Sequence, residues 1–191
     1  MIEFDSAARA YCNSINALYR RYSDDILVIC DPSHAAAVES KIMALILAEK
    51  LEISPHKTER TEFEKASINI VGSGKSAQYL GFSLHETGPA IRESSLARQW
   101  RKMRRTMRRT GKIAMLKIAA GKSTKAYTKR LYRRFTHLKV RDNEGVRTVR
   151  NFSSYGRRSA AVFDGDEKIT QQIKRFERAA LRKIDEIKKI K

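Results

Sequence analysis

The stretch from Tyr19 to Cys30 constrains the fold of this chain more than any other, because it places two adjacent carboxylates between two strand-like runs. The first run is led by an aromatic residue, and the second, residues 26–30, is apolar and rich in β-branched side chains. Such runs favour strands, and aspartate is common at bends. The pattern therefore predicts a hairpin with Asp24 and Asp25 at the bend. Neighbouring acids repel each other unless a divalent cation neutralises them, so a solvated turn and a metal site are both open interpretations.

Charge is unevenly divided along the chain. Residues 1–90 contain 9 Lys and Arg against 12 Asp and Glu, a net charge of −3, whereas residues 91–191 contain 31 against 9, a net charge of +22. A generally basic protein would spread its charge over both halves. The asymmetry instead indicates an acidic, metal-holding part followed by a part that binds a polyanion such as a nucleic acid.

The composition excludes several other classes of protein. Two cysteines, Cys12 and Cys30, and four histidines form neither a disulfide framework nor a zinc site, and both thiols are expected to be reduced. No run reaches the roughly 20 apolar residues of a membrane span, and the first five residues do not resemble a secretory signal. We expect one or two small domains in a cytoplasmic protein that does not contact a membrane.

Apolar spacing predicts helix, hairpin, helix and further strands for the first part of the chain. Residues 3–18 have helical spacing, and Asp31-Pro32 predicts the cap and first turn of a helix that reaches about Lys50. The inward residues of that helix are expected to be Val38, Ile42, Leu45 and Ile46. The expected strands are residues 51–53 and several within 61–84, with a turn at 72–74. This order favours an α+β fold with an antiparallel sheet.

Gly88-Pro89 is expected to mark the boundary between two domains, residues 1–88 and 89–191. Ser94 or Ser95 then predicts the cap of a basic helix whose apolar positions are Leu96, Trp100, Met103 and Met107. A second helix is expected over residues 124–138, with Tyr127, Leu131 and Phe135 inward, and a third over about 167–190. The apolar stripe of the third is Ile169, Ile173, Phe176, Ala180, Ile184 and Ile187. Residues 139–166 are expected to form a loop or small hairpin, and the three helices a small bundle with basic outer faces.

Two further motifs resemble binding sites but lack residues that such sites require. Residues 72–76 resemble a phosphate-binding loop, but the first glycine of that motif would fall at Asn69 and no helix is expected to follow. Asp164-Gly165-Asp166 lacks the remaining ligands of a calcium loop, and it is expected to cap the last helix.

Four features in chain order resemble the reverse transcriptases of prokaryotes, the retron, group II intron and phage-defence enzymes. Tyr22-Ser23-Asp24-Asp25 is similar to their YxDD motif, and Lys57-Thr58 follows at the position of their motif D. Tyr79-Leu80-Gly81-Phe82 resembles their primer grip, and the basic segment after it resembles their thumb. Each feature also has an ordinary interpretation as a surface lysine, a turn or a solvated helix face. Their shared order is what favours the family.

The resemblance implies a partial right-hand polymerase palm, an antiparallel sheet with helices, over residues 1–88, and an all-α basic thumb bundle over residues 89–191. It implies an RNA-directed DNA polymerase that binds an RNA template with a DNA primer and dNTPs, and that uses Mg²⁺ or Mn²⁺. Asp24 and Asp25 would then be the catalytic metal ligands, Lys57 would assist the leaving group, and Tyr22 would lie near the primer end. The implied primer-grip residues are Tyr79, Leu80, Gly81 and Phe82. The implied nucleic-acid contacts of the thumb are Arg98, Arg101, Lys102, Arg104, Arg105, Arg108 and Arg109.

Enzymes of this family carry fingers and a third metal-binding carboxylate upstream of YxDD, yet only 23 residues precede Asp24. Asp5 is the acid besides Glu3 that could compete for that role, but residues 3–8 resemble the helix that links the family's motifs B and C. We therefore expect a fragment or a split enzyme that is inactive without an N-terminal fingers and palm polypeptide. The alternative is a non-catalytic RNA-binding or maturase-like module with a vestigial palm. A third hypothesis is a basic protein of another fold with a chance YSDD.

Overall fold

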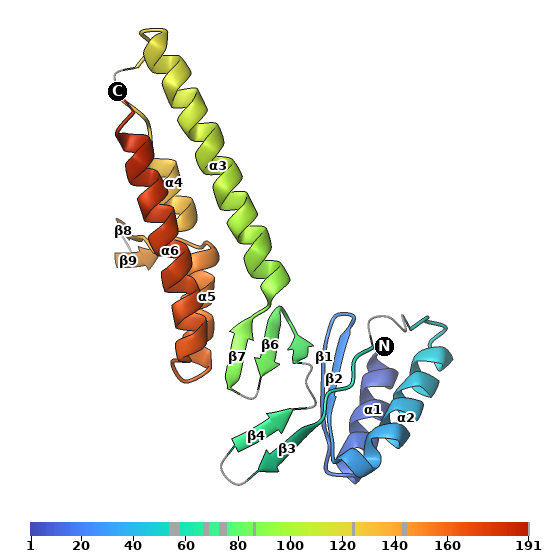
Figure 1. Cartoon of the computed structure of the whole chain (residues 1–191). Coiled ribbons are helices and arrows are strands. Elements are labelled where there is room, and N and C mark those ends of the chain that lie inside the picture. The colour runs from blue at the N-terminus through green and yellow to red at the C-terminus, as the bar shows by residue number, and fades with distance from the viewer. Residues whose placement is uncertain are drawn as a thin grey trace. The chain divides into compact units, whose positions relative to one another are not determined.

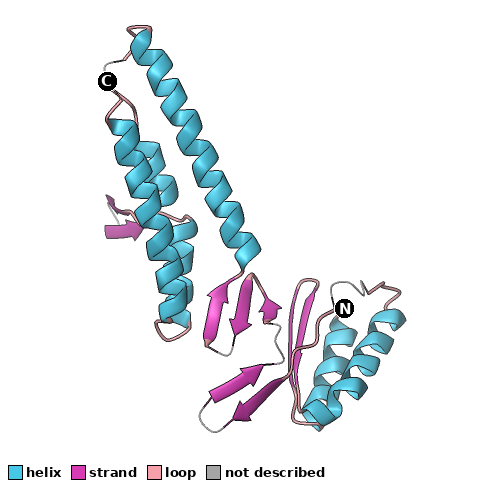
Figure 2. Cartoon of the chain, viewed as in Figure 1, coloured by secondary structure: helices cyan, strands magenta, loops and turns pink. Residues whose placement is uncertain are grey.

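The computed structural model of the chain describes residues 1–53, 58–66, 69–72, 76–85, 87–123, 125–142 and 145–190. Within these residues the fold is α+β, with small antiparallel sheets, six α-helices and a mostly helical C-terminal half (Figure 2). The chain divides into two compact units. The N-terminal unit comprises Met1–Leu80 and Leu84–Thr87, and the C-terminal unit comprises Gly81–Ser83 and Gly88–Lys191.

Two helices and a hairpin form the core of the N-terminal unit. They are α1 (Ile2–Ser14), β1 (Leu18–Tyr22), β2 (Asp25–Ile29) and α2 (Ala35–Ala48), with a short 3-10 turn, η1 (Pro32–His34), before α2. Helices α1 and α2 lie side by side and cover one face of the hairpin (Figure 1). Phe4, Ala8, Cys12, Ala17 and Tyr19 form a buried cluster, with Val28, Ile42 and Leu45 packed against it, and Val38 on α2 is buried as well. Cys12 and Cys30 are free thiols.

Asp31 caps the 3-10 turn η1, as the Asp31-Pro32 pair indicated, but α2 itself begins at Ala35, and the predicted end of α1 is wrong. The Asp31 carboxylate accepts a hydrogen bond of 2.9 Å from the Ser33 amide, and Pro32 stands in the first turn. Helix α1 ends at Ser14 rather than at residue 18, because Asn16 takes a positive φ of 54° and Leu18 already belongs to β1. Helical spacing alone cannot detect this stop.

Residues 51–53 were expected to form a strand, and they do not. Lys50 takes a positive φ of 58°, its amide donates to the Leu47 carbonyl, and the Leu51 amide donates to the Ile46 carbonyl. These two bonds form the Schellman motif that closes α2. The Leu51 amide is therefore engaged by the helix end and cannot pair with a neighbouring strand.

Short strands follow over residues 61–84, as the sequence predicted, and a further strand lies beyond them. Strands β3 (Phe63–Ala66) and β4 (Asn69–Gly72) form one hairpin. Strands β5 (Ala77–Tyr79), β6 (Phe82–His85) and β7 (Gly88–Ile91) form a sheet in that order. The predicted turn after Gly72 lies outside the described residues. Gly88-Pro89 lies within β7 rather than in a linker, and proline is tolerated there because β7 is an edge strand.

Four helices build most of the C-terminal unit. They are α3 (Glu93–Ala119), α4 (Lys129–Phe135), α5 (Phe152–Val162) and α6 (Glu167–Lys188), with a hairpin of β8 (Lys139–Asp142) and β9 (Gly145–Thr148) between α4 and α5. All six residues of the predicted α6 stripe are buried, which confirms that helix. Asp166 caps it, as expected, by accepting a bond of 2.8 Å from the Ile169 amide.

Several other expectations for this unit are wrong. Arg92 is the cap residue of α3, so Ser94 and Ser95 lie inside the helix. Helix α4 begins at Lys129 instead of residue 124, and Tyr127 before it is 73% exposed rather than inward. Residues 139–166 contain α5 besides a hairpin. The C-terminal half is consequently mostly helical rather than all-α, and the bundle has four helices rather than three.

Buried Glu177 connects three segments of the bundle. Its carboxylate forms an ion pair with Arg157 on α5 and accepts a hydrogen bond of 2.8 Å from the His137 amide, just after α4. Asn151 adds a capping box with Ser154 at the start of α5, and its side-chain amide donates to the Arg133 and Thr136 carbonyls at 2.9 and 2.8 Å. These bonds fix the end of α4 against the start of α5.

Candidate metal-binding hairpin and nucleic-acid interface

The β1–β2 hairpin holds the acidic residues at a two-residue turn. Tyr22 pairs with Asp25 across the ladder, which leaves Ser23 and Asp24 to connect the strands. Ser23 has a positive φ of 58°, the conformation that short hairpin turns require. Asp24 therefore lies at the bend as predicted, whereas Asp25 is the first residue of β2.

Alternation along the strands brings Tyr22 and Asp25 to the same face of the hairpin. Tyr19 and Val28 are paired residues that face the helical core, and residues paired across an antiparallel ladder share a face. Tyr22 and Asp25 lie on the opposite face, where Tyr22 is 66% exposed. The tyrosine and the carboxylate thus reach solvent side by side.

Both turn carboxylates are exposed and unpaired. Asp24 and Asp25 are exposed, and neither forms a hydrogen bond or ion pair through its side chain with any residue that the structure describes. Exposed carboxylate oxygens without a protein partner are the donors that Mg²⁺ and Mn²⁺ prefer. The two residues fit part of the coordination shell of a divalent cation.

Asp5 is held differently, because its carboxylate is engaged by two neighbours. The Arg21 guanidinium donates to Asp5 Oδ1 at 2.6 Å and also forms an ion pair with Oδ2, and the Tyr19 hydroxyl donates at 2.7 Å. Hydrogen bonds from Arg21, and then from Tyr19, lower the pKa of Asp5 to about 2. Burial, followed by the Asp5 contact, raises the pKa of Tyr19.

Arg21 also donates a hydrogen bond of 2.6 Å to the carbonyl of Ser23. One guanidinium therefore connects α1 to the acidic turn and fixes the turn backbone. The described residues contain no group of three or more His, Cys, Asp or Glu that could hold a metal ion. The hairpin offers two carboxylates, and Asp5 serves to position the turn that carries them.

The four residues expected to form a primer grip lie at a second hairpin turn. Tyr79 ends β5, Leu80 and Gly81 form the turn, and Phe82 begins β6. Leu80 and Gly81 both take positive φ, 48° and 85°, which is the conformation of a tight hairpin turn. Gly81 is needed for this φ rather than for space, since no heavy atom lies within 4 Å of an added Cβ. Lys57, the expected aid to the leaving group, lies outside the described residues.

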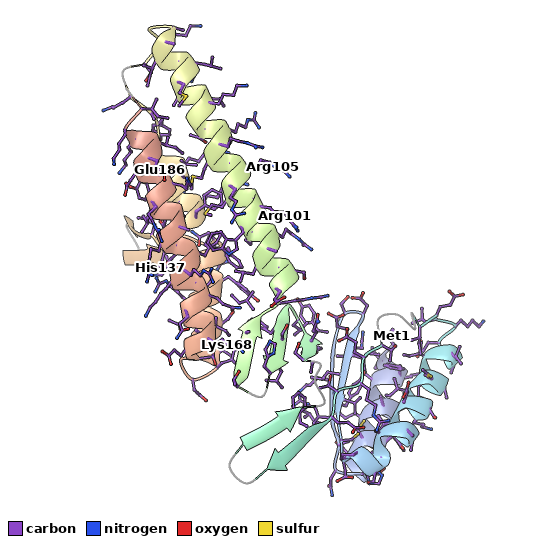
Figure 3. All side chains as sticks on the ribbon, in the orientation of Figure 1. Met1, Arg101, Arg105, His137, Lys168 and Glu186 are labelled. Atoms are coloured by element: carbon purple, nitrogen blue, oxygen red, sulfur yellow. The ribbon has the colours of Figure 1, made fainter. Side chains whose placement is uncertain are left out.

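Helix α3 displays all seven basic residues expected to contact nucleic acid. Its buried face consists of Met103, Met107, Gly111 and Ala114. At 100° per residue, Arg101, Arg105 and Arg109 lie on the opposite face, and Figure 3 shows Arg101 and Arg105 projecting away from α6. The whole set is exposed and forms no ion pair within the described part of the chain: Arg98, Arg101, Lys102, Arg104, Arg105, Arg108 and Arg109.

A second basic surface belongs to a helix for which the sequence predicted a basic outer face but no individual contact residues. It lies over α4 and includes Lys129, Arg130, Arg133 and Arg134, which line an open hollow with Tyr127. The run of four cations within six residues, with aromatic residues at both ends, is a signal that the sequence already contained.

A comparison with models of protein families found no match to this chain, and a comparison with curated proteins found none either.

Proposed function

We propose that this chain is the C-terminal palm and thumb of a prokaryotic RNA-directed DNA polymerase, with residues 1–88 as the palm part and 89–191 as the thumb. The observation that carries the proposal is the tip of the β1–β2 hairpin, where Asp24 and Asp25 are adjacent, exposed and unpaired, with Tyr22 beside them. The turn at residues 79–82 and the basic helices follow in the order of the family's motifs. A cytoplasmic location belongs to this proposal. Among the described residues, no helix combines the length and apolar character of a membrane span.

Each residue has a defined role in this proposal. Asp24 and Asp25 hold Mg²⁺ or Mn²⁺, which when bound activates the primer hydroxyl and offsets the charge of the reacting phosphates. Tyr22 is placed to contact the primer end, and Arg21 holds the turn in register. Residues 79–82 grip the primer, Lys57 assists the leaving pyrophosphate, and the arginines of α3 contact the phosphates of the RNA–DNA duplex.

The fingers, the dNTP pocket and a third carboxylate are supplied by another segment or polypeptide in this proposal. The support is the outer face of the β1–β2 hairpin, where Leu18 and Ile29 are 40% and 56% exposed. Among the described residues, this sheet has two strands, so both of its edges are open. This face also carries Arg20, Tyr22 and Asp25, but its apolar end and the open edges are suited to pairing with further strands of a palm.

The test is Mg²⁺-dependent extension of a DNA primer on an RNA template. We expect no synthesis by this chain alone and synthesis after addition of the polypeptide encoded immediately upstream. In the mixture, Asp24→Asn and Asp25→Asn should each reduce the rate by at least about 100-fold, because each removes charge from the metal site. Glu39→Gln, an exposed acid on α2, is the control and should leave the rate unchanged. Synthesis retained by both aspartate variants would contradict the proposal.

The second candidate is a non-catalytic RNA-binding or maturase-like module. Two observations favour it. The cations of α3 and α4 form no ion pair within the described residues, and the hairpin offers two carboxylates where a polymerase needs three. This module would bind RNA with a steep salt dependence and would be indifferent to Mg²⁺ and to substitution of Asp24 and Asp25. Silence in the mixed extension assay, with tight RNA binding retained, would select it over the polymerase.

A further inference from the structure

Two open hollows in the C-terminal unit share residues of α4. The first is lined by Tyr127, Lys129, Arg130, Arg133 and Arg134. The second is lined by Lys102, Arg133, Arg134, Arg150, Phe152, Tyr155 and their neighbours Gln99, Phe135 and Asn151. Arg133 and Arg134 line both hollows, which are therefore adjacent, and we call the residues that line them the basic track. It runs from Tyr127 past α4 to Tyr155 at the start of α5.

The basic track is strongly cationic, and its cations have no protein counter-charge. No acidic side chain lines either hollow. Within the part of the chain that the structure describes, none of its six cations forms an ion pair: Lys102, Lys129, Arg130, Arg133, Arg134 and Arg150. Arg134 lies over the Phe135 ring at 5.5 Å from its centroid, which leaves the guanidinium edge free to bind an anion.

The backbone beneath the basic track is fixed. The Asn151 side chain donates to the Arg133 and Thr136 carbonyls, and Glu177 holds the segment just after α4. The cations therefore project from a rigid support, which reduces the ordering cost of binding.

Aromatic side chains stand at both ends of the basic track. Tyr127 is 73% exposed at one end, and no ring contact to it is formed within the described residues. Tyr155 is 36% exposed at the other end, and its ring stacks on Phe152 and Phe82 with centroids 6.4 and 6.0 Å apart. A positively charged groove with aromatic rings along it suits single strands, because their unpaired bases can stack on the rings. A duplex keeps its base faces inside the stack and offers mainly phosphates.

We propose that the basic track binds a single-stranded nucleic-acid segment, separately from the duplex that the outer face of α3 contacts. Phosphates lie against Arg133, Arg134 and their neighbouring cations, and one base stacks on Tyr127. The site shares with the proposed function only the premise that this unit binds nucleic acid. It does not require the chain to polymerise.

The experiment compares two adjacent arginine pairs in the full chain, using labelled oligo(U), labelled oligo(dT) and a blunt RNA–DNA duplex of matched length as probes. Arg133→Gln with Arg134→Gln should weaken single-strand binding about tenfold and make the slope of log K against log salt shallower by about 1.4, since each lost phosphate contact accounts for about 0.7. Duplex binding should change much less. Arg108→Gln with Arg109→Gln on α3 should show the reverse preference. The tighter of the two single-stranded probes identifies the track as an RNA or a DNA site.

Tyr127 provides a second test that does not depend on charge or on the core. Tyr127→Ala should weaken single-strand binding about fivefold, whereas Tyr127→Phe, which keeps the ring, should bind like the parent. The inference is overturned if Tyr127→Ala has no effect, or if the two arginine pairs affect both probes equally. In that case, persistent primer extension would show that the proposed function stands without it. If the parent chain binds none of the nucleic-acid probes, both this inference and the proposed function are overturned.

Discussion

At the scale of single residues, Arg21 organises the acidic turn. Its guanidinium contacts the Asp5 carboxylate on α1 and the Ser23 carbonyl in the turn, so a residue of the strand joins the helix to the bend. A charged pair that is only partly exposed is worth more than a surface pair, because solvent screens it less. Asp24 and Asp25 are consequently presented by a turn whose backbone is braced from within the unit.

Replacement of Asp5 by asparagine should loosen this turn in a pH-dependent way. At pH 7 the variant loses the charged hydrogen bonds of Arg21, and we expect the N-terminal unit to be destabilised by about 1–2 kcal/mol. The pKa of Asp5 is lowered to about 2, so its contribution is present above its ordinary pKa near 3.8 and is lost as the pH falls through about 2.

The measurement is hydrogen exchange of peptides covering residues 1–30, in parent and variant, at several pH values. The gap between them should be full above about pH 4 and should close toward pH 2. A gap of constant size across this range would show that Asp5 acts by shape rather than by charge. Glu39→Gln should exchange like the parent at every pH.

At the scale of elements, α5 and α6 show why one helix was predicted and the other was missed. Helix α6 buries an aliphatic and aromatic stripe at helical spacing, which is the strongest signal that a sequence gives. Helix α5 buries Ser153, Ser154, Gly156, Ser159 and Ala160, and the serines and the glycine among them favour turns when they are read alone. The small residues of α5 are needed because α6 packs closely against them. The local sequence of α5 does not reveal how close α6 lies.

The same distinction separates the parts of the candidate sites. The hairpin that carries Asp24 and Asp25 is local, so twelve residues of sequence sufficed to predict it. The contact between Asp5 and Arg21 joins two elements, and the basic track joins α3, α4 and the start of α5. Such contacts depend on tertiary packing, which spacing along one segment cannot specify.

Gly156 tests the close packing of α5 against α6. A Cβ added there would lie 2.3 Å from both Cγ1 and Cδ1 of Ile173, a fully buried side chain with little room to move. We expect Gly156→Ala to destabilise the C-terminal unit by about 1–3 kcal/mol.

Gly111 on α3 is the matched control, since it is also a buried helical glycine. Its added Cβ would lie 3.7 Å from Ile187 and 3.8 Å from Ile190, which is ordinary contact. Gly111→Ala should stabilise the unit by about 0.5–1 kcal/mol, because alanine loses less backbone entropy in a helix. Thermal unfolding followed by Trp100 fluorescence measures both. Equal effects of the same sign would contradict the packing argument.

At the scale of the whole molecule, the two halves of the chain differ both in net charge and in which of their charged residues form ion pairs. The N-terminal unit pairs Asp5 with Arg21 and leaves the two turn acids free, whereas the described cations of α3 and α4 form no ion pairs. A net charge of +22 over residues 91–191 repels itself, and this cost is offset when a polyanion binds. The free energy with which this unit binds a nucleic acid should therefore depend strongly on the salt concentration.

Duplex binding is expected on the outer face of α3. Arg101, Arg105 and Arg109 form one stripe opposite the buried methionines, and a duplex lying along it would release the counterions of the phosphates they contact. Replacing all three by glutamine should make the slope of log K against log salt shallower by about 2–3, since each contact to a duplex accounts for about 0.9. The control replaces Lys174, Arg178 and Arg182, a stripe of equal charge on α6, by glutamine. It should change the slope by less than about 0.9, the value of a single phosphate contact. Only a localised interface distinguishes two stripes of the same charge. If both triple variants reduce the slope equally, the duplex is attracted by the net charge of the unit and not by a defined surface.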